Sequence, residues 1–243
     1  MNIRVITCCK NEEKMLPFFL QYYSQFVDEI SIYDGGSTDG SLEIISKFLK
    51  AKVYSTGEND QVNDCFLTDV RNNAYKENKE NWDWQIVVDA DEFLHHPNLV
   101  EKLEEYKNNG ITVPLTIGYE TRSLYFPEYN SNKTIVEQIK TGIRNDRWQA
   151  KKVISNSKEV SVNYYIGCHN SDFSGNVVHS IPELMVLHYR WISYDYFVNK
   201  NKYISNRLSD YNKEHGFGWH TSAWSTMSEI EFNENVNNAL ECI

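Results

Sequence analysis

The chain has 243 residues, of which 41% are hydrophobic and 14% aromatic, and its formal net charge is −10. This length and composition allow a full core to be buried in one domain and exclude an intrinsically disordered protein. The acidic balance argues against a nucleic-acid partner, because a phosphate backbone requires a basic surface. A small phosphorylated ligand is still compatible with this negative charge, because a bound metal and one or two local cations can neutralise the phosphate.

The sequence predicts neither a membrane span nor a secretion signal. No apolar run approaches the length that spans a bilayer, and the first residues lack the charged-then-apolar pattern of a secretion signal. The five cysteines are odd in number and show no metal-ligand spacing, which favours reduced thiols. We therefore expect a cytoplasmic protein without a transmembrane segment, and peripheral recruitment to a membrane face through a partner stays open.

Strands and helices alternate through the first hundred residues. The apolar patterns predict strands over 2–9, 29–33, 52–54 and 85–88, and helices over 10–26, 42–49 and 64–79. This order predicts an α/β fold in which helices flank a mostly parallel sheet on both faces. Ligands bind such sheets at the carboxyl ends of the strands, so the loops beginning at Lys10, Asp34 and Asp89 should share one rim.

The pattern changes beyond about residue 110. Further strands are predicted over 112–125 (interrupted at Pro114 and Gly118), 151–154, 160–166 and 184–189, before an amphipathic C-terminal part. A helix is predicted over 194–212, with Ser193 as its N-cap and Gly216 as its stop. We expect one domain over 1–243, in which about 1–110 bind a nucleotide and about 111–243 shape the acceptor side.

The strand over 85–88 runs directly into the carboxylates of Asp89, Asp91 and Glu92. Burying unpaired charges is costly, so these side chains should lie where the strand emerges. Asp89 and Asp91 are two residues apart and project from the same side of an extended backbone. Two hard oxygen donors so placed suit Mg²⁺ or Mn²⁺ carrying the phosphates of a ligand, although Asp-x-Asp is also common in solvated turns.

Four segments in this order resemble the family-2-like glycosyltransferases of the GT-A fold, and more narrowly the branch with an Asp-Ala-Asp-Glu-Phe signature. They are 5–13 with Lys-Asn-Glu, 32–41 with Asp-Gly-Gly-Ser-Thr-Asp-Gly, 68–74 with Arg-Asn, and 87–94. A fifth segment, 187–190 with Leu-His-Tyr-Arg, followed by Ser193 and Lys200, is similar to that branch's later His-Tyr motif.

The resemblance implies a metal-dependent, inverting transferase that uses Mn²⁺ or Mg²⁺. The implied donor is a nucleotide-diphosphate sugar, a UDP-sugar first, and the implied acceptor is the hydroxyl of a glycan, glycolipid or polysaccharide precursor. The resemblance assigns the donor site to Lys10, Asn11, Glu12, Asp34, Arg71, Asp89 and Ala90. It assigns the metal site to Asp89, Asp91 and His188.

Several of these assignments have a plainer alternative. Asp34 is equally suited to a turn or a helix cap, and Glu12 to capping the next helix. Arg71 suits a diphosphate but also a surface ion pair with Asp69 or Glu77. His188 fits the imidazole ligand of a metal, whereas a single histidine at a strand end is more often a hydrogen-bonded structural residue.

Other side chains compete for the same roles. His169 and His179 are alternatives to His188. The candidate phosphate cations are each, on their own merits, better explained as surface charges: Lys151, Lys152, Arg190 and Lys200.

The family's usual acidic base motif after the metal strand is not clearly present. Glu120, on the strand that should flank the acceptor pocket, is our candidate for the catalytic base, with Asp146 and Asp172 as alternatives. A sugar-nucleotidyltransferase is a rival class, but it would require a glycine-rich basic loop after the first strand, and residues 8–12 contain no glycine. A non-catalytic carbohydrate-binding module on the same fold is the other rival.

Overall fold

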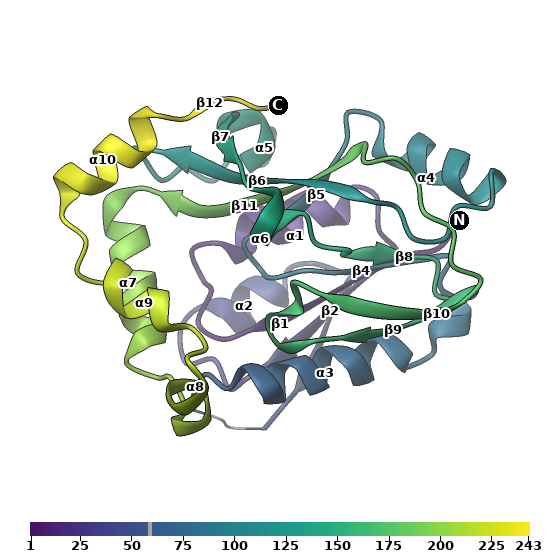
Figure 1. The fold of residues 1–243 in the computed structure, drawn as a ribbon, viewed down its shortest axis with the longest axis horizontal. Coiled ribbons are helices and arrows are strands. Elements are labelled where there is room, and N and C mark those ends of the chain that lie inside the picture. Colours follow the sequence, from purple (N-terminus) through teal and green to yellow (C-terminus); the bar gives the residue numbers. More distant parts are fainter. Residues whose placement is uncertain (58–59) are drawn as a thin grey trace.

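The computed structural model describes residues 1–57 and 60–243, and a five-stranded sheet lies at its centre (Figure 1). The strand order is β3-β2-β1-β4-β8, and the order reverses between β1 and β4. The strands are β1 (Ile3–Cys9), β2 (Glu29–Asp34), β3 (Ala51–Ser55), β4 (Trp84–Val87) and β8 (Ile154–Ser155). The first four run parallel and β8 pairs antiparallel with β4, so the predicted α/β class with a mostly parallel sheet is confirmed.

Both faces of this sheet are covered because the strands alternate their side chains between two cores. On one face Val5 joins the core formed with α1 (Leu16–Ser24) and α2 (Ser41–Ile45). On the other face Ile6 packs with α3 (Asp64–Lys76) and with β9 (Val160–Tyr164), which pairs with β10 (Ser171–Gly175). Short 3₁₀ turns lie at Lys79–Asn81 and Ile166–Cys168.

The chain continues from the central sheet into a second five-stranded sheet. Its order is β12-β7-β6-β11-β5. The strands are β5 (Glu92–His95), β6 (Thr116–Ser123), β7 (Thr141–Arg144), β11 (Leu184–Ile192) and β12 (Leu240–Glu241). Residues 88–91 carry the chain from β4 in the first sheet to β5 in the second, so the acidic motif lies at the junction of the two sheets.

The remaining helices follow β5 in the sequence. They are α4 (Leu99–Asn108), α5 (Ile135–Gln138), α6 (Asp146–Gln149), α7 (Tyr194–Ser205), α8 (Asp210–His215), α9 (Trp219–Trp224) and α10 (Glu229–Asn237). The last four gather at one end of the molecule (Figure 1). An aromatic core around Trp191, Phe197 and Phe232 attaches α7, α9 and α10 to β11. Among residues 1–57 and 60–243, no helix has the length and apolarity needed to cross a membrane.

Two local predictions are wrong in extent. The helix predicted over 194–212 is divided, because the Ser209 hydroxyl accepts from the Asn212 backbone amide and starts α8 as a separate helix, which ends at the predicted stop Gly216. Ser193 is the N-cap of α7, as predicted, although it has φ +55° and makes no side-chain capping bond. The strand predicted over 151–154 shortens to β8, and Leu99–Asn108 forms a helix that was not predicted.

Candidate active site

Asn11 joins the loops that follow β1 and β2 and connects both to α7. Its backbone N–H donates to Ser37 Oγ at 2.9 Å, and its Oδ1 accepts from the Thr38 amide at 2.7 Å. Its Nδ2 donates to the Tyr203 hydroxyl at 2.8 Å. Asn11 adopts a left-handed backbone conformation with φ +55°, which asparagine tolerates better than most residues. The predicted shared rim therefore includes a helix from the far end of the chain.

The Asp34 carboxylate shapes its own loop. Asp34 Oδ2 accepts from the backbone amides of Gly36 at 2.9 Å and Ser37 at 3.0 Å, and Oδ1 accepts from the Ser37 hydroxyl at 2.6 Å. Gly36 has φ +81°, which suits glycine at this turn. These bonds are those of the turn alternative, and the nucleotide contact of Asp34 stays a prediction.

Asp89 is held by two cations. Arg71 forms an ion pair with Asp89 Oδ1, and Lys151 Nζ lies 3.8 Å from Oδ2. Burial alone would raise the pKa of Asp89, but the charges of Arg71 and Lys151 outweigh it and lower the pKa below its ordinary value. Arg71 is only 8% exposed, so a surface ion pair with Asp69 or Glu77 is excluded.

Asp91 faces two ionisable groups, both from the second half of the chain. Its Oδ2 lies 3.0 Å from Lys200 Nζ, and its Oδ1 lies 3.6 Å from His188 Nε2. Lys200 Nζ also lies 3.0 Å from the Glu12 carboxylate, which therefore binds this lysine and does not cap α1. Burial would raise the pKa of Asp91, yet Lys200 and His188 hold it well below its ordinary value.

Glu92 and Lys151 form the most buried ion pair of the site. The Glu92 side chain is 1% exposed and the Lys151 side chain 7%, and the two groups are in direct contact. The other Glu92 oxygen accepts from the Asp89 amide at 3.1 Å, which fixes the turn that carries the motif. Glu92 is thus a buried supporting residue rather than a solvated one. The surface-charge interpretation is wrong for Lys151, and for Lys200, whose side chain is 12% exposed.

His188 is oriented by a residue that the sequence did not single out. Gln149 Nε2 lies 3.0 Å from His188 Nδ1, and Gln149 Oε1 is buried without a hydrogen-bond partner. An amide donating to Nδ1 leaves the ring proton on Nε2, facing Asp91. Rotating the amide by half a turn would let Oε1 accept from Nδ1–H and would free Nε2 to bind a metal. Gly118 permits this approach, since a Cβ there would lie 2.2 Å from the Gln149 backbone.

Glu120 lies beside His188 across the strands. The two residues are register partners in the parallel β6–β11 pair, so their side chains project from the same face. Glu120 Oε2 lies 3.5 Å from Arg122 Nη2. The alternatives have other partners: Asp146 accepts from Arg144 at 2.7 Å, and Asp172 accepts from Tyr165.

The competing histidines bind backbone carbonyls instead. His169 Nδ1 lies 2.8 Å from the Trp148 carbonyl oxygen, and His179 Nδ1 lies 3.0 Å from that of Val113.

Ala90 is 4% exposed between the two aspartates. Within the described part of the chain, no group of three or more His, Cys, Asp or Glu side chains is arranged to hold a metal ion. Arg71 and Lys151 hold Asp89, and the metal site of Asp89, Asp91 and His188 stays a prediction.

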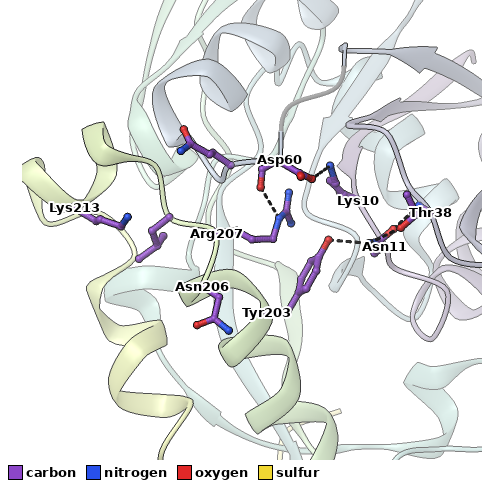
Figure 2. Close-up of a pocket in the computed structure, with 10 residues that line it drawn as sticks. Lys10, Asn11, Thr38, Asp60, Tyr203, Asn206, Arg207 and Lys213 are labelled. Atoms are coloured by element: carbon purple, nitrogen blue, oxygen red, sulfur yellow. Dashed lines mark hydrogen bonds and ion pairs between the residues drawn. The ribbon is translucent and has the colours of Figure 1, made fainter.

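A cavity of about 480 Å³ lies at the loops that Asn11 joins (Figure 2). Lys10, Asn11 and Thr38 line it from the strand-edge loops. Tyr203 and Arg207 line it from α7 and the segment that follows, and Figure 2 shows the Tyr203 ring reaching towards Asn11. Neither of these two residues was predicted. In the sequence they are marked only by their positions three and seven residues after Lys200, within the stretch predicted as one helix.

The family described as Glycosyl transferase family 2 matches residues 4–161, about two thirds of the chain. No curated protein matches the chain.

Several solved structures are similar to the chain at low identity. The structure of S. aureus TarS has 15% identity and a TM-score of 0.44, and the match covers 88% of this chain and 41% of TarS. S. aureus TarS 1–349 in complex with UDP has 14% identity and a TM-score of 0.45, with coverages of 88% and 68%. Glucosyl-3-phosphoglycerate synthase from Mycobacterium tuberculosis, in complex with Mn²⁺, UDP and glucosyl-3-phosphoglycerate, has 23% identity and a TM-score of 0.33, with coverages of 51% and 44%. The chain thus spans less than half the length of two of these three matched chains.

Proposed function

The chain belongs to glycosyl transferase family 2, and on that premise we propose that it transfers a sugar from a nucleoside-diphosphate sugar to a hydroxyl acceptor. The observation that best supports this function is that residues from both halves of the chain come together around Asp91. Glu12 and Asp91 come from the edge of the parallel sheet, whereas His188 and Lys200 come from β11 and α7. We propose that residues 1–243 act as one catalytic domain for this reason.

The cavity of Figure 2 is our candidate for the nucleoside site. Its volume of about 480 Å³ lies within the range of about 300–1,000 Å³ that is usual for small-molecule sites. Lys10, Arg207 and Lys213 contribute positive charge, and Asp60, which pairs with Lys10 at 3.1 Å, contributes a negative charge. Asn11 and Thr38 contribute hydrogen-bonding groups, and Tyr203 contributes an aromatic ring. Glu12 directly follows Lys10 and Asn11, so a nucleoside bound here places its diphosphate towards Glu12 and Asp91.

The Asp91–His188 pair fits a divalent ion. Adjacent ligands of an octahedral ion at about 2.1 Å are roughly 3 Å apart, and Asp91 Oδ1 and His188 Nε2 are separated by 3.6 Å. With two protein ligands, the remaining positions suit phosphate oxygens and water. Mn²⁺ or Mg²⁺ held by this pair would stabilise the negative charge on the departing diphosphate.

Glu120 is our candidate for the catalytic base. In the proposed displacement the acceptor oxygen bonds to the anomeric carbon, the bond from that carbon to the diphosphate oxygen breaks, and the base takes the hydroxyl proton. Glu120 supports this role by projecting from the same face of the sheet as its register partner His188. Arg122 holds the Glu120 carboxylate in place from the same strand.

The test is to incubate the purified protein with Mn²⁺ and a panel of nucleotide sugars, UDP-sugars first, and to measure release of the nucleoside diphosphate. We expect slow hydrolysis of one donor without an acceptor, and its loss in the Glu120→Gln and Asp91→Asn variants. A requirement for a nucleoside triphosphate with release of pyrophosphate would instead identify a nucleotidyltransferase. Binding of sugar without turnover of any donor would identify a non-catalytic module.

A further inference from the structure

The Lys200 ammonium occupies the space between two buried carboxylates. Its Nζ lies 3.0 Å from Asp91 Oδ2, 3.0 Å from Glu12 and 3.2 Å from the Tyr196 hydroxyl. The side chains of Asp91, Lys200 and Glu12 are 5%, 12% and 19% exposed. One lysine therefore neutralises two acidic groups that water reaches poorly.

The pKa values of the three groups reflect this arrangement. Burial alone would lower the pKa of Lys200, but the charges of Asp91 and Glu12 outweigh burial and hold the pKa well above its ordinary value. Burial raises the pKa of Glu12, and Lys200 only partly offsets that effect. The lysine thus stays protonated, and its removal would leave two carboxylates in need of another cation.

Asp91 is also the carboxylate to which a divalent ion would bind. One of its oxygens faces Lys200 and the other faces His188, so an ion held by Asp91 and His188 would share a single carboxylate with the ammonium. Two cations on one carboxylate repel each other, and the low effective dielectric of a buried site strengthens the repulsion. Glu12 compensates for only part of this excess of positive charge.

We propose that Lys200 competes with the divalent ion for Asp91, and that the donor diphosphate relieves the competition by drawing the ammonium towards itself. This inference rests on the metal and donor sites of the proposed function. A lysine ammonium is a point charge on a flexible four-carbon chain, which allows it to exchange one anionic partner for another. Metal and donor then bind cooperatively, because each is more readily accommodated when the other is present.

The experiment is to measure Mn²⁺ binding by calorimetry, with and without UDP, in the wild type and in Lys200→Met. In the wild type we expect UDP to tighten Mn²⁺ binding about tenfold, the scale of ordinary coupling between sites. In Lys200→Met we expect Mn²⁺ alone to bind about tenfold more tightly than to the wild type. UDP should then tighten Mn²⁺ binding by a smaller factor than in the wild type, because only the coordination by its phosphate oxygens is left. Lys202→Met is the matched control, since Lys202 is an exposed lysine on the same helix, and it should behave as the wild type.

A second variant guards against loss of folding. Lys200→Met leaves Glu12 and Asp91 facing each other, whereas Lys200→Met/Glu12→Gln removes one charge of each sign and still frees Asp91. If circular dichroism shows that the single variant is unfolded, the double variant is measured, and the same gain in Mn²⁺ affinity is expected.

The outcomes separate this inference from the proposed function. Equal Mn²⁺ affinity in the wild type and the folded Lys200 variants overturns the competition, even if the wild type hydrolyses a donor. Tighter Mn²⁺ binding in the variants supports the competition, even if no donor of the panel is turned over. Absence of Mn²⁺ binding from every variant, with and without UDP, overturns both the competition and the metal site.

Discussion

The two halves of the chain contribute opposite charges to the same site. Around the acidic motif the first half supplies the carboxylates that form the ion pairs: Glu12, Asp89, Asp91 and Glu92. The candidate base Glu120 is an acidic group of the second half. The second half supplies the imidazole and two of the buried cations: Lys151, His188 and Lys200. Arg71 is the exception, a cation that the first half provides for itself. The comparison indicates that the acidic edge of the parallel sheet is completed electrostatically by the second sheet and α7.

The largest effect should come from Asp91, where the two halves meet. We predict that Asp91→Asn abolishes Mn²⁺-dependent binding of UDP, because the amide replaces a charged metal ligand while Lys200 keeps Glu12 as a partner. The expected loss is at least about 100-fold, above the roughly 10- to 100-fold typical of residues that only support a metal ligand. Calorimetry with UDP and Mn²⁺ measures it, and circular dichroism checks the fold.

Asp89→Asn is the matched comparison. Asp89 is held by Arg71 and Lys151, so we expect a smaller loss of Mn²⁺-dependent affinity than in Asp91→Asn. Undiminished Mn²⁺-dependent affinity in Asp91→Asn would show that Asp91 does not bind the metal. The contact of both halves at Asp91 would then no longer support the proposed function.

The next largest effect tests the dependence of folding on the second half's cations. Lys151→Met should lower the free energy of unfolding by about 3–5 kcal/mol, because it leaves the Glu92 carboxylate buried without its partner. Urea denaturation at neutral pH measures the change. Lys47→Met is the control, since Lys47 pairs with Glu43 at the surface, and it should cost under about 1 kcal/mol. Equal, small losses in both variants would show that the acidic turn is stable without Lys151.

The sequence predicted the first half well because its signals are local. Apolar runs of strand length alternate with helical spacing, and in a parallel sheet this alternation alone brings the loops at Lys10, Asp34 and Asp89 to one edge. The grouping of Glu12 with Asp91 follows from that rule. The role of Asp34 does not follow from that rule. An aspartate at this position is expected both for shaping a turn and for contacting a nucleotide.

The second half was harder to predict because its important contacts are long-range. Lys151 and Lys200 look like surface charges in the sequence. The pairing of β8 with β4 brings Lys151 next to the motif, and the packing of α7 brings Lys200 there. The contact of Gln149 with His188 is also long-range. It needs the close approach that Gly118, distant in the sequence, permits. The family resemblance identified His188 without revealing its neighbour.

A smaller effect is expected at His188 itself. His188→Ala should weaken Mn²⁺ binding in the presence of UDP by about 10- to 100-fold, since Asp91 and the phosphates keep the remaining contacts. Gln149→Leu should produce a smaller loss in the same direction, because it only releases the ring orientation. His179→Ala is the control, as that ring binds the Val113 carbonyl. Unchanged affinity and turnover in His188→Ala would exclude it from the site.

The smallest effect concerns the contact between α7 and the loop after β1. Tyr203→Phe removes the hydroxyl that accepts from Asn11 Nδ2 at 2.8 Å and keeps the ring that lines the cavity. One such hydrogen bond contributes about 1 kcal/mol, so we predict about fivefold weaker binding of UDP, with Mn²⁺ affinity in its absence unchanged.

Tyr211→Phe is the matched control for this last variant. Tyr211 stacks on His215 within α8, outside the residues that line the cavity, and its substitution should leave UDP binding unchanged. Calorimetry on the two variants compares the loss of one phenolic hydroxyl at each position. A wild-type affinity in Tyr203→Phe would mean that α7 reaches the site only through Lys200, and that the nucleoside cavity depends on the first half alone. A fivefold loss would instead extend the interdependence of the two halves from the charged groups to the cavity.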